Sequence, residues 1–200
     1  NEDGTEWTFT LRDDVTFHDG EPFNAEAVCA NFERMFDQNK AGQTAGEYWG
    51  YVMGAFKNKA ADSLYQGCEA TGEFEAVITI SGATSGFPTM LTLEALSMQS
   101  PKAMEEGDAN GIAAAGEGFS FPDYANNPVG TGPFKVASWK KQDAVNMVRN
   151  EGMWQVRWNT TALHPGLGAN QTLALRADPP GRASVNERGG SDVLVPGYLY

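Results

Sequence analysis

One segment near the start of the chain, residues 7–28, constrains the fold more than any other part of the sequence. The apolar residues Trp, Phe and Leu of positions 7–11 alternate with polar ones, which is the two-residue period of a half-buried strand. A turn and a short strand follow, and Asp19-Gly20 supplies a second tight turn. Asn24 is then placed to cap the free N–H groups of a helix. We therefore expect a strand and a capped helix in close succession.

Apolar residues continue at helical spacing from Ala25 to about Asp37, which predicts a helix with one buried face. That face consists of Val28, Cys29, Phe32, Met35 and Phe36. Alternation predicts three further strands, and proline and serine signals predict two short helical stretches. The strands are 74–80, 134–139 and 144–149, the last two forming a hairpin, and the helical stretches are 88–96 and 102–106.

Three segments lack such periodicity, and we expect them to be loops. Residues 37–50 are polar and rich in turn-forming residues, and residues 64–70 form a loop that carries Cys68. Residues 107–127 are rich in Gly, Ala and Asn, which predicts an excursion over the surface.

Charge and composition exclude several classes of function. The chain carries 14 Lys and Arg against 26 Asp and Glu, a formal net charge of −12. Surfaces that bind nucleic acid or anionic membranes need Lys and Arg, so we expect neither partner. The charge favours solubility instead. Apolar residues make up 41% of the chain, enough for a core, but no apolar run is long enough to span a bilayer.

Two blocks of the sequence resemble a known family. Residues 7–28 are similar to the pattern W-x-F-x-LR-x-x-V-x-FHDG-x-P-x-x-A-x-x-V of the bacterial extracellular solute-binding proteins of family 5, the dipeptide-, oligopeptide- and nickel-binding components of ABC importers. The matching residues are Trp7, Phe9, Leu11, Arg12, Val15, Phe17, His18, Asp19, Gly20, Pro22, Ala25 and Val28. The second block, residues 127–134 (NPVGTGPF) with Trp139 and Arg149-Asn150 after it, resembles the PVGTGPF…W…RN pattern of the same family.

The resemblance implies an α/β (α+β) fold, with mixed sheets and short helices. It implies part of the large lobe of a bilobal, type II-like periplasmic binding protein, with the second lobe absent. Residues 1–127 are expected to form the smaller subdomain of the first lobe, and residues 128–200 to return to its main sheet. Family members are much longer, and no leader precedes the first strand, so we expect a piece that starts inside the mature protein.

The match weakens after Asn150. Residues 155–171 look like a divergent loop, and the family pattern partly returns over residues 173–193. The helix expected there is poorly supported, because the sequence PPGRASVNERGG contains two prolines and three glycines.

The implied function is extracellular capture of a solute for uptake through an ABC permease in the membrane. A peptide is the first ligand class, and nickel or another small solute is the alternative. The family implies an exported protein, periplasmic or anchored to the cell surface, and we expect a monomer without cofactor or metal. Hinge closure between two lobes is an established mechanism for such receptors. The alternatives are a structural fragment that binds nothing, and a hydrolase of unrecognised type.

The hydrolase alternative depends on the histidines, of which the chain has two, His18 and His164. Neither lies in a recognisable Ser-His-Asp or Cys-His arrangement. We interpret His18, which lies beside Asp19, as a turn residue whose ring hydrogen-bonds locally rather than as a general base. The GTGPF segment lacks the spacing of a phosphate-binding loop and fits a constrained turn, and the resemblance implies a structural element near the hinge.

The candidate ligand-binding residues are Tyr48, Trp49 and Tyr51, since aromatic side chains beside a cleft are common in solute pockets. The family implies that the segment after the first helix approaches the ligand. The alternative is that these rings pack the segment onto its own lobe.

An exported chain with just two cysteines favours one disulfide, Cys29–Cys68. Closing this loop of about 40 residues would stabilise the fold by about 4 kcal/mol in the chain-entropy description. The alternative is a pair of buried free thiols. The spacing of the two residues does not fit a zinc site.

Overall fold

The computed structural model describes residues 1–151, 183–186 and 193–197. The chain divides into two compact units, Asn1–Trp154 and Gln155–Tyr200. In the second unit the described residues form one antiparallel hairpin, of β8 (Ala183–Asn186) and β9 (Val193–Gly197). Residues 155–171, where a divergent loop is expected, lie outside the described residues, as do most of residues 173–193, where the family pattern partly returns.

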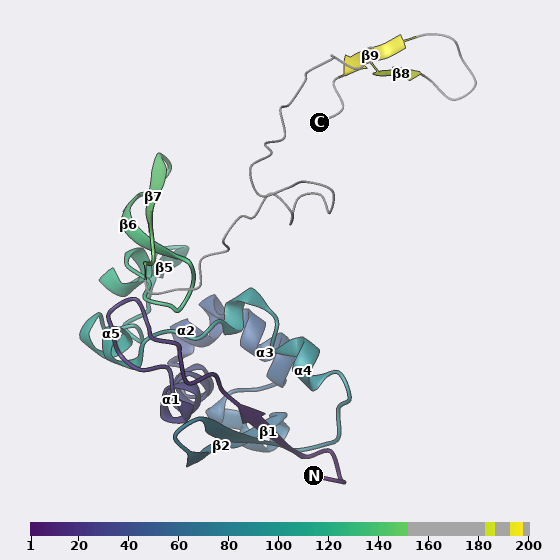
Figure 1. The fold of residues 1–200 in the computed structure, drawn as a ribbon, viewed down its shortest axis with the longest axis vertical. Coiled ribbons are helices and arrows are strands. Elements are labelled where there is room, and N and C mark those ends of the chain that lie inside the picture. Colours follow the sequence, from purple (N-terminus) through teal and green to yellow (C-terminus); the bar gives the residue numbers. More distant parts are fainter. Residues whose placement is uncertain (152–182, 187–192, 198–200) are drawn as a thin grey trace, which may run out of the picture. The chain divides into compact units, whose positions relative to one another are not determined.

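The first unit mixes small sheets with short helices, as the sequence predicts (Figure 1). Its elements, in chain order, are β1 (Glu6–Thr10), α1 (Ala25–Phe36), α2 (Lys40–Ala45), α3 (Glu47–Met53), η1 (Lys57–Asp62), β2 (Tyr65–Gly72), β3 (Glu75–Ile80), α4 (Phe87–Met90), η2 (Glu94–Leu96), α5 (Pro101–Glu106), β4 (Ala113–Ala115), β5 (Gly118–Ser120), η3 (Asp123–Asn126), β6 (Phe134–Lys140) and β7 (Ala144–Arg149).

The main sheet of this unit has the order β1-β3-β2, with both pairs antiparallel. The predicted alternation of β3 is confirmed, because Ala76, Ile78 and Ile80 are buried while their neighbours are more exposed. In β1, Trp7 pairs with Ile78 and Phe9 with Ala76, so these side chains share the buried face. The strand after the first turn is reduced to one bridge, between Thr16 and Pro22.

Helix α1 covers the buried face of the sheet. The Asn24 side chain accepts a hydrogen bond of 2.9 Å from the Ala27 amide, so the predicted cap is confirmed. The predicted apolar face of α1 joins β3 and α3 in one core cluster. The fully or largely buried members of that cluster are Ala25, Val28, Phe32, Phe36, Trp49, Met53, Tyr65, Ala76, Ile78, Ile80, Phe87 and Leu96.

A disulfide joins α1 to the edge strand β2. The sulfur atoms of Cys29 and Cys68 are bonded, and the two residues are 39 positions apart in the sequence. Cys68 pairs with Ile78 across the strands, so its side chain lies on the face of the sheet that α1 covers.

Two of the predicted loops are regular structure. Residues 64–70 belong largely to β2, which has two register shifts and mostly exposed side chains, so it lacks the alternation that would have indicated a strand. Residues 37–50 contain α2 and most of α3. Three glycines in the sequence KAGQTAGEYWG lower its helix propensity, and packing of Trp49 and Met53 in the core compensates.

The two sequence blocks that carry the family resemblance contact each other. The His18 amide donates a hydrogen bond of 2.9 Å to the Gly130 carbonyl. Nε2 of the His18 ring lies 2.9 Å from the Gly132 carbonyl oxygen, and the Gly130 amide donates to Nδ1 over 3.4 Å. The Lys135 ammonium donates to the His18 carbonyl at 3.0 Å. The prediction of local hydrogen bonds for His18 is therefore wrong, because the partners of its ring are 112 and 114 residues away.

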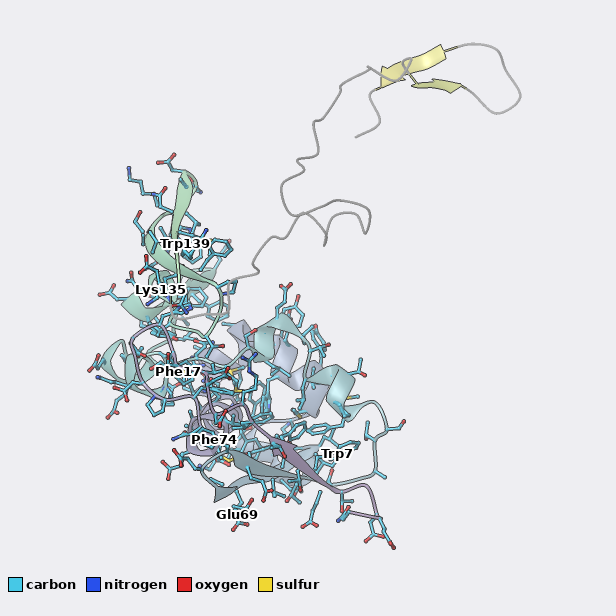
Figure 2. All side chains as sticks on the ribbon, in the orientation of Figure 1. Trp7, Phe17, Glu69, Phe74, Lys135 and Trp139 are labelled. Atoms are coloured by element: carbon cyan, nitrogen blue, oxygen red, sulfur yellow. A yellow bond between two sulfur atoms is a disulfide. The ribbon has the colours of Figure 1, made fainter. Side chains whose placement is uncertain are left out.

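The predicted hairpin of β6 and β7 is confirmed, and it has one apolar face. Val136 pairs with Met147 and Trp139 with Val145 across the strands, and Phe134 lies on the same side as Val136. The side chains of these residues are largely exposed, from 45% for Trp139 to 55% for Phe134, and Val136 is half-buried. Figure 2 shows Trp139 on this hairpin. The opposite face is mostly polar, with Asn146 donating to the Ser138 hydroxyl at 2.9 Å.

Residues 107–127 include the short exposed hairpin of β4 and β5, in accord with the predicted surface excursion. The segment is anchored at both ends, because Ala109 and Tyr124 form a small buried cluster with Met104 of α5.

Candidate functional site

The three aromatic candidates, Tyr48, Trp49 and Tyr51, all lie on α3, but not on one face. Trp49 is completely buried, and its indole N–H donates a hydrogen bond of 3.0 Å to the Ala55 carbonyl. Its ring meets that of Tyr65 edge to face at 5.5 Å. In this chain Trp49 is therefore part of the core, as the packing alternative of the sequence analysis describes.

Tyr48 and Tyr51 lie on the other side of the helix, three positions apart, which is the spacing of neighbours on one helix face. Their side chains are 53% and 74% exposed, and the rings meet edge to face at 6.2 Å. The Tyr51 hydroxyl donates to the Glu47 carboxylate over 3.2 Å. Attraction of the hydroxyl proton by this carboxylate raises the pKa of Tyr51.

An open groove of about 530 Å³ lies beside α3. Its other wall is the segment of α4 and η2, and its lining mixes aliphatic, hydroxyl and carboxylate groups. A volume of this size is within the range of small-molecule sites. The lining residues are Tyr48, Val52, Thr89, Met90, Thr92, Leu93, Glu94 and Ala95.

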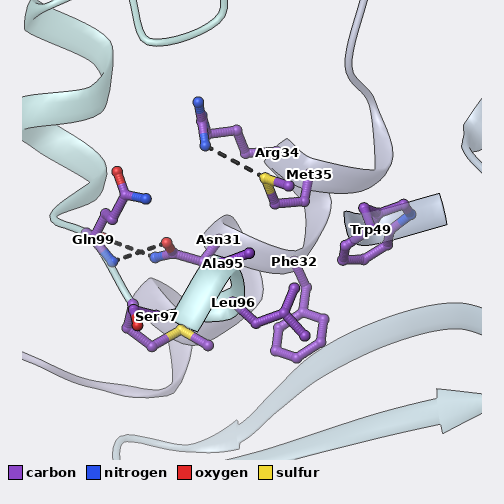
Figure 3. Close-up of a pocket in the computed structure, with 10 residues that line it drawn as sticks. Asn31, Phe32, Arg34, Met35, Trp49, Ala95, Leu96, Ser97 and Gln99 are labelled. Atoms are coloured by element: carbon purple, nitrogen blue, oxygen red, sulfur yellow. Dashed lines mark hydrogen bonds between the residues drawn. The ribbon is translucent and has the colours of Figure 1, made fainter. Parts of the chain in front are cut away.

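A second cavity, between α1 and the residues around η2, is too small for a solute. Its volume is about 20 Å³, roughly what one water molecule needs. Figure 3 shows how Asn31 closes it: its amide donates to the Gln99 carbonyl, and its carbonyl oxygen accepts from the Gln99 amide. Arg34 also lines it, and burial lowers the pKa of that guanidinium. Ala95 borders both this cavity and the groove.

A serine, an aspartate and a histidine meet near the start of α5, but not in a catalytic order. The buried Ser100 hydroxyl donates to the Asp19 carboxylate at 2.5 Å and accepts from the Ala103 amide at 3.3 Å. The His18 ring is bonded to backbone groups instead of the serine. The imidazole that would act as the base of a Ser-His-Asp arrangement therefore does not reach the serine. Ser100 instead caps the start of α5.

Across the described ranges, no group of three or more His, Cys, Asp or Glu side chains is placed to hold a metal ion. The helices of those ranges are also too short and too polar for any of them to cross a membrane.

The sequence profile of the bacterial extracellular solute-binding proteins, family 5 (middle region), matches residues 1–185. This chain belongs to that family. The groove and the aromatic face of α3 therefore lie in a solute-binding protein fold, as the two sequence blocks indicate.

Curated relatives support the assignment. The chain is 30% identical over 198 residues to a glutathione-binding protein, GsiB, of Escherichia coli O1:K1, covering 98% of this chain and 32% of the relative. It is 30% identical over 196 residues to the nickel-binding periplasmic protein of Escherichia coli K12, covering 97% and 31%. The chain thus spans about a third of the length of these relatives.

Among solved structures, the fold is similar to the ABC transporter-associated periplasmic binding protein DppA from Helicobacter pylori, which was solved with the peptide STSA. The TM-score is 0.55 with 25% identity, over 78% of this chain and 29% of the other. The fold expected from the sequence is therefore confirmed as that of a periplasmic binding protein segment.

Proposed function

We propose that this chain supplies part of the ligand-capturing lobe of a solute-binding receptor, which delivers its solute to an ABC permease. Membership of family 5 over residues 1–185 is the observation that carries this proposal. Relatives named for glutathione and nickel binding, and a similar structure solved with a peptide, support a small polar solute as the ligand. We favour a peptide, because a peptide offers both apolar side chains and charged groups to a groove with mixed lining.

Within this proposal, the groove between α3 and the α4–η2 segment forms one wall of the ligand site. Tyr48 lines it, and Tyr51 meets Tyr48 edge to face. Both rings are held by the helix while remaining accessible, so contact with a ligand costs little additional ordering. Trp49 acts indirectly, because its burial fixes α3 and thereby the two tyrosines.

The wider proposal is supported by the same family membership. The protein is exported, acts in the periplasm or at the cell surface, works as a monomer and carries out no chemistry on its solute. Residues 1–127 belong to the smaller subdomain of the first lobe, and residues 128–200 return to the main sheet of that lobe. A second lobe closes over the ligand by a hinge motion.

An NMR titration of this chain tests the proposal. Amide shifts are followed while a mixed pool of di- to pentapeptides is added. We expect weak, saturable shifts confined to α3, α4 and η2, because a ligand enclosed by two lobes makes only part of its contacts with one of them.

Replacing both Tyr48 and Tyr51 by alanine should abolish those shifts. Phe121→Ala is the matched control, since Phe121 is a comparably exposed aromatic residue (49%) that does not line the groove. Shifts that survive the double replacement, or that map to other elements, would contradict the proposal. Submicromolar affinity would contradict the view that this chain holds only one wall of the site.

A further inference from the structure

The charge in the lining of the groove is negative. Glu94 is the charged residue of its lining, and the described residues that line the groove include no Lys, Arg or His. The Glu94 carboxylate is exposed and forms no ion pair with any described residue. Glu47 adds a second carboxylate beside the rings, through its hydrogen bond with Tyr51. An anion entering this groove would therefore meet repulsion, and a cation attraction.

The two tyrosine rings strengthen the same preference. An aromatic face attracts a cation, by roughly 0.5–1 kcal/mol at an exposed site. Tyr48 and Tyr51 offer exposed ring surface edge to face with each other. The raised pKa of Tyr51 keeps its hydroxyl protonated, so that hydroxyl remains a donor to Glu47.

The rest of the lining is apolar or uncharged. Val52, Met90 and Leu93 supply aliphatic surface, and Thr89 and Thr92 supply hydroxyl groups. Thr92 already donates to the Thr89 carbonyl at 2.7 Å. Such a wall fits a hydrocarbon stem that ends in a charge, because the stem is covered while the charged end reaches the carboxylates.

We infer that this groove selects a cationic group on an apolar stem, an ammonium or guanidinium such as a lysine or arginine side chain of a peptide, over neutral and anionic groups of the same size. The inference depends on the proposed function, because it names the ligand chemistry of the same site. It does not depend on the net charge of the chain, which would attract cations to any part of the surface.

The test uses three small probes with one phenyl group each: phenethylammonium, phenethyl alcohol and phenylpropionate. Each is titrated into the chain, and amide shifts of α3 and η2 are measured. We expect the ammonium to bind about three- to tenfold more tightly than the alcohol, and the carboxylate not to bind. Added salt should reduce the advantage of the ammonium, because these charges are exposed.

Glu94→Gln should lower the affinity for the ammonium several times more than the affinity for the alcohol, and so reduce that advantage. Glu69→Gln, an exposed carboxylate on β2, changes net charge equally and should leave both affinities unchanged. Equal affinity for ammonium and alcohol, or equal effects of the two replacements, would overturn the cation preference alone. If no probe shifts the amides of α3 and η2, the groove is not a ligand site, and the proposed function of the groove fails with it.

Discussion

His18 and Gly130 bind each other through two hydrogen bonds across 112 residues of sequence. The His18 amide donates to the Gly130 carbonyl, and the Gly130 amide donates to the His18 ring. Because Nδ1 accepts this bond, the other ring nitrogen carries the proton and donates to the Gly132 carbonyl. The histidine of the first sequence block therefore joins the start of the chain to the glycine-rich turn before β6.

Replacing His18 by alanine should lower the free energy of unfolding by about 1–2 kcal/mol, because the Gly130 amide loses its ring partner while the Gly132 carbonyl keeps its bond from Asn150. Urea unfolding measures the loss. His18→Gln should lose less, since its amide can donate to one carbonyl. An alanine variant as stable as the parent would show that these bonds contribute nothing.

The Cys29–Cys68 disulfide should account for a large part of the stability of the first unit. Reduction should lower the free energy of unfolding by about 4 kcal/mol, the value for a loop of this length in the chain-entropy description. The variant with both cysteines replaced by alanine should match the reduced protein and should not respond to reductant. Alkylation should modify no cysteine before reduction and both of them after it, as mass spectrometry can measure.

Neighbouring residues of α3 should respond differently to truncation. Trp49→Ala should cost about 3–5 kcal/mol of stability, because the ring is fully buried among aromatic side chains. Tyr48→Ala should change stability by less than about 0.5 kcal/mol, since most of its side chain is in water. Urea unfolding of both variants gives the comparison. Similar costs for the two would mean that Tyr48 also belongs to the core.

Tyr65 should make stability fall at high pH. Burial and the hydrogen bond from its hydroxyl to Glu33, 2.6 Å long, raise the pKa of Tyr65 above its ordinary value of 10.0. Above that pH the unfolded chain releases the proton while the folded chain retains it, so the free energy of unfolding decreases as the pH rises.

Tyr65→Phe should reduce that decrease, measured as unfolding free energy at neutral pH and about one unit above the ordinary tyrosine pKa. The variant should also lose about 1–2 kcal/mol at neutral pH, the contribution of the hydrogen bond. An identical pH dependence in the variant would assign the decrease to the other tyrosines with raised pKa, Tyr51 and Tyr124.

The apolar face of β6 and β7 should bind hydrophobic dyes. Replacing Trp139 and Met147 together by threonine should lower the fluorescence of bound anilinonaphthalene sulfonate and change stability by less than about 0.5 kcal/mol. Val148→Thr is the control, because Val148 is equally exposed but lies on the opposite face. A loss of fluorescence as large in the control would locate the dye elsewhere.

The sequence predicts the elements whose periodicity agrees with their packing. The sequence predicts the cap at Asn24, the buried face of α1 and the alternation of β3, because one side of each element packs against the core. The sequence pattern does not predict strand β2. It lies at the sheet edge, and its attachment depends on backbone pairing and on the bond from Cys68 rather than on an alternating pattern.

The candidate site is predictable only in part, because residues 37–50 are polar and rich in turn-forming residues, which favours a loop. Once residues 47–53 are known to be a helix, positions 48 and 51 share one face and positions 49 and 53 another. The sequence therefore predicts, once this helix is known, that Trp49 and the two tyrosines lie on different faces of α3. Glu94 was not predictable, since only folding brings η2 to the other side of the groove.

The order of synthesis matters for a sheet arranged as β1-β3-β2. Strand β1 leaves the ribosome first, but it can pair only after β3 has followed, whereas β2 and β3 are adjacent in sequence and can close a hairpin within microseconds. The ring of His18 can form its hydrogen bonds only after Gly130 and Gly132, more than a hundred residues later in the chain, have been made. The segment that carries β1 and His18 is therefore made before its partners and reaches its native place only after them, and until then its apolar residues are a target for chaperones.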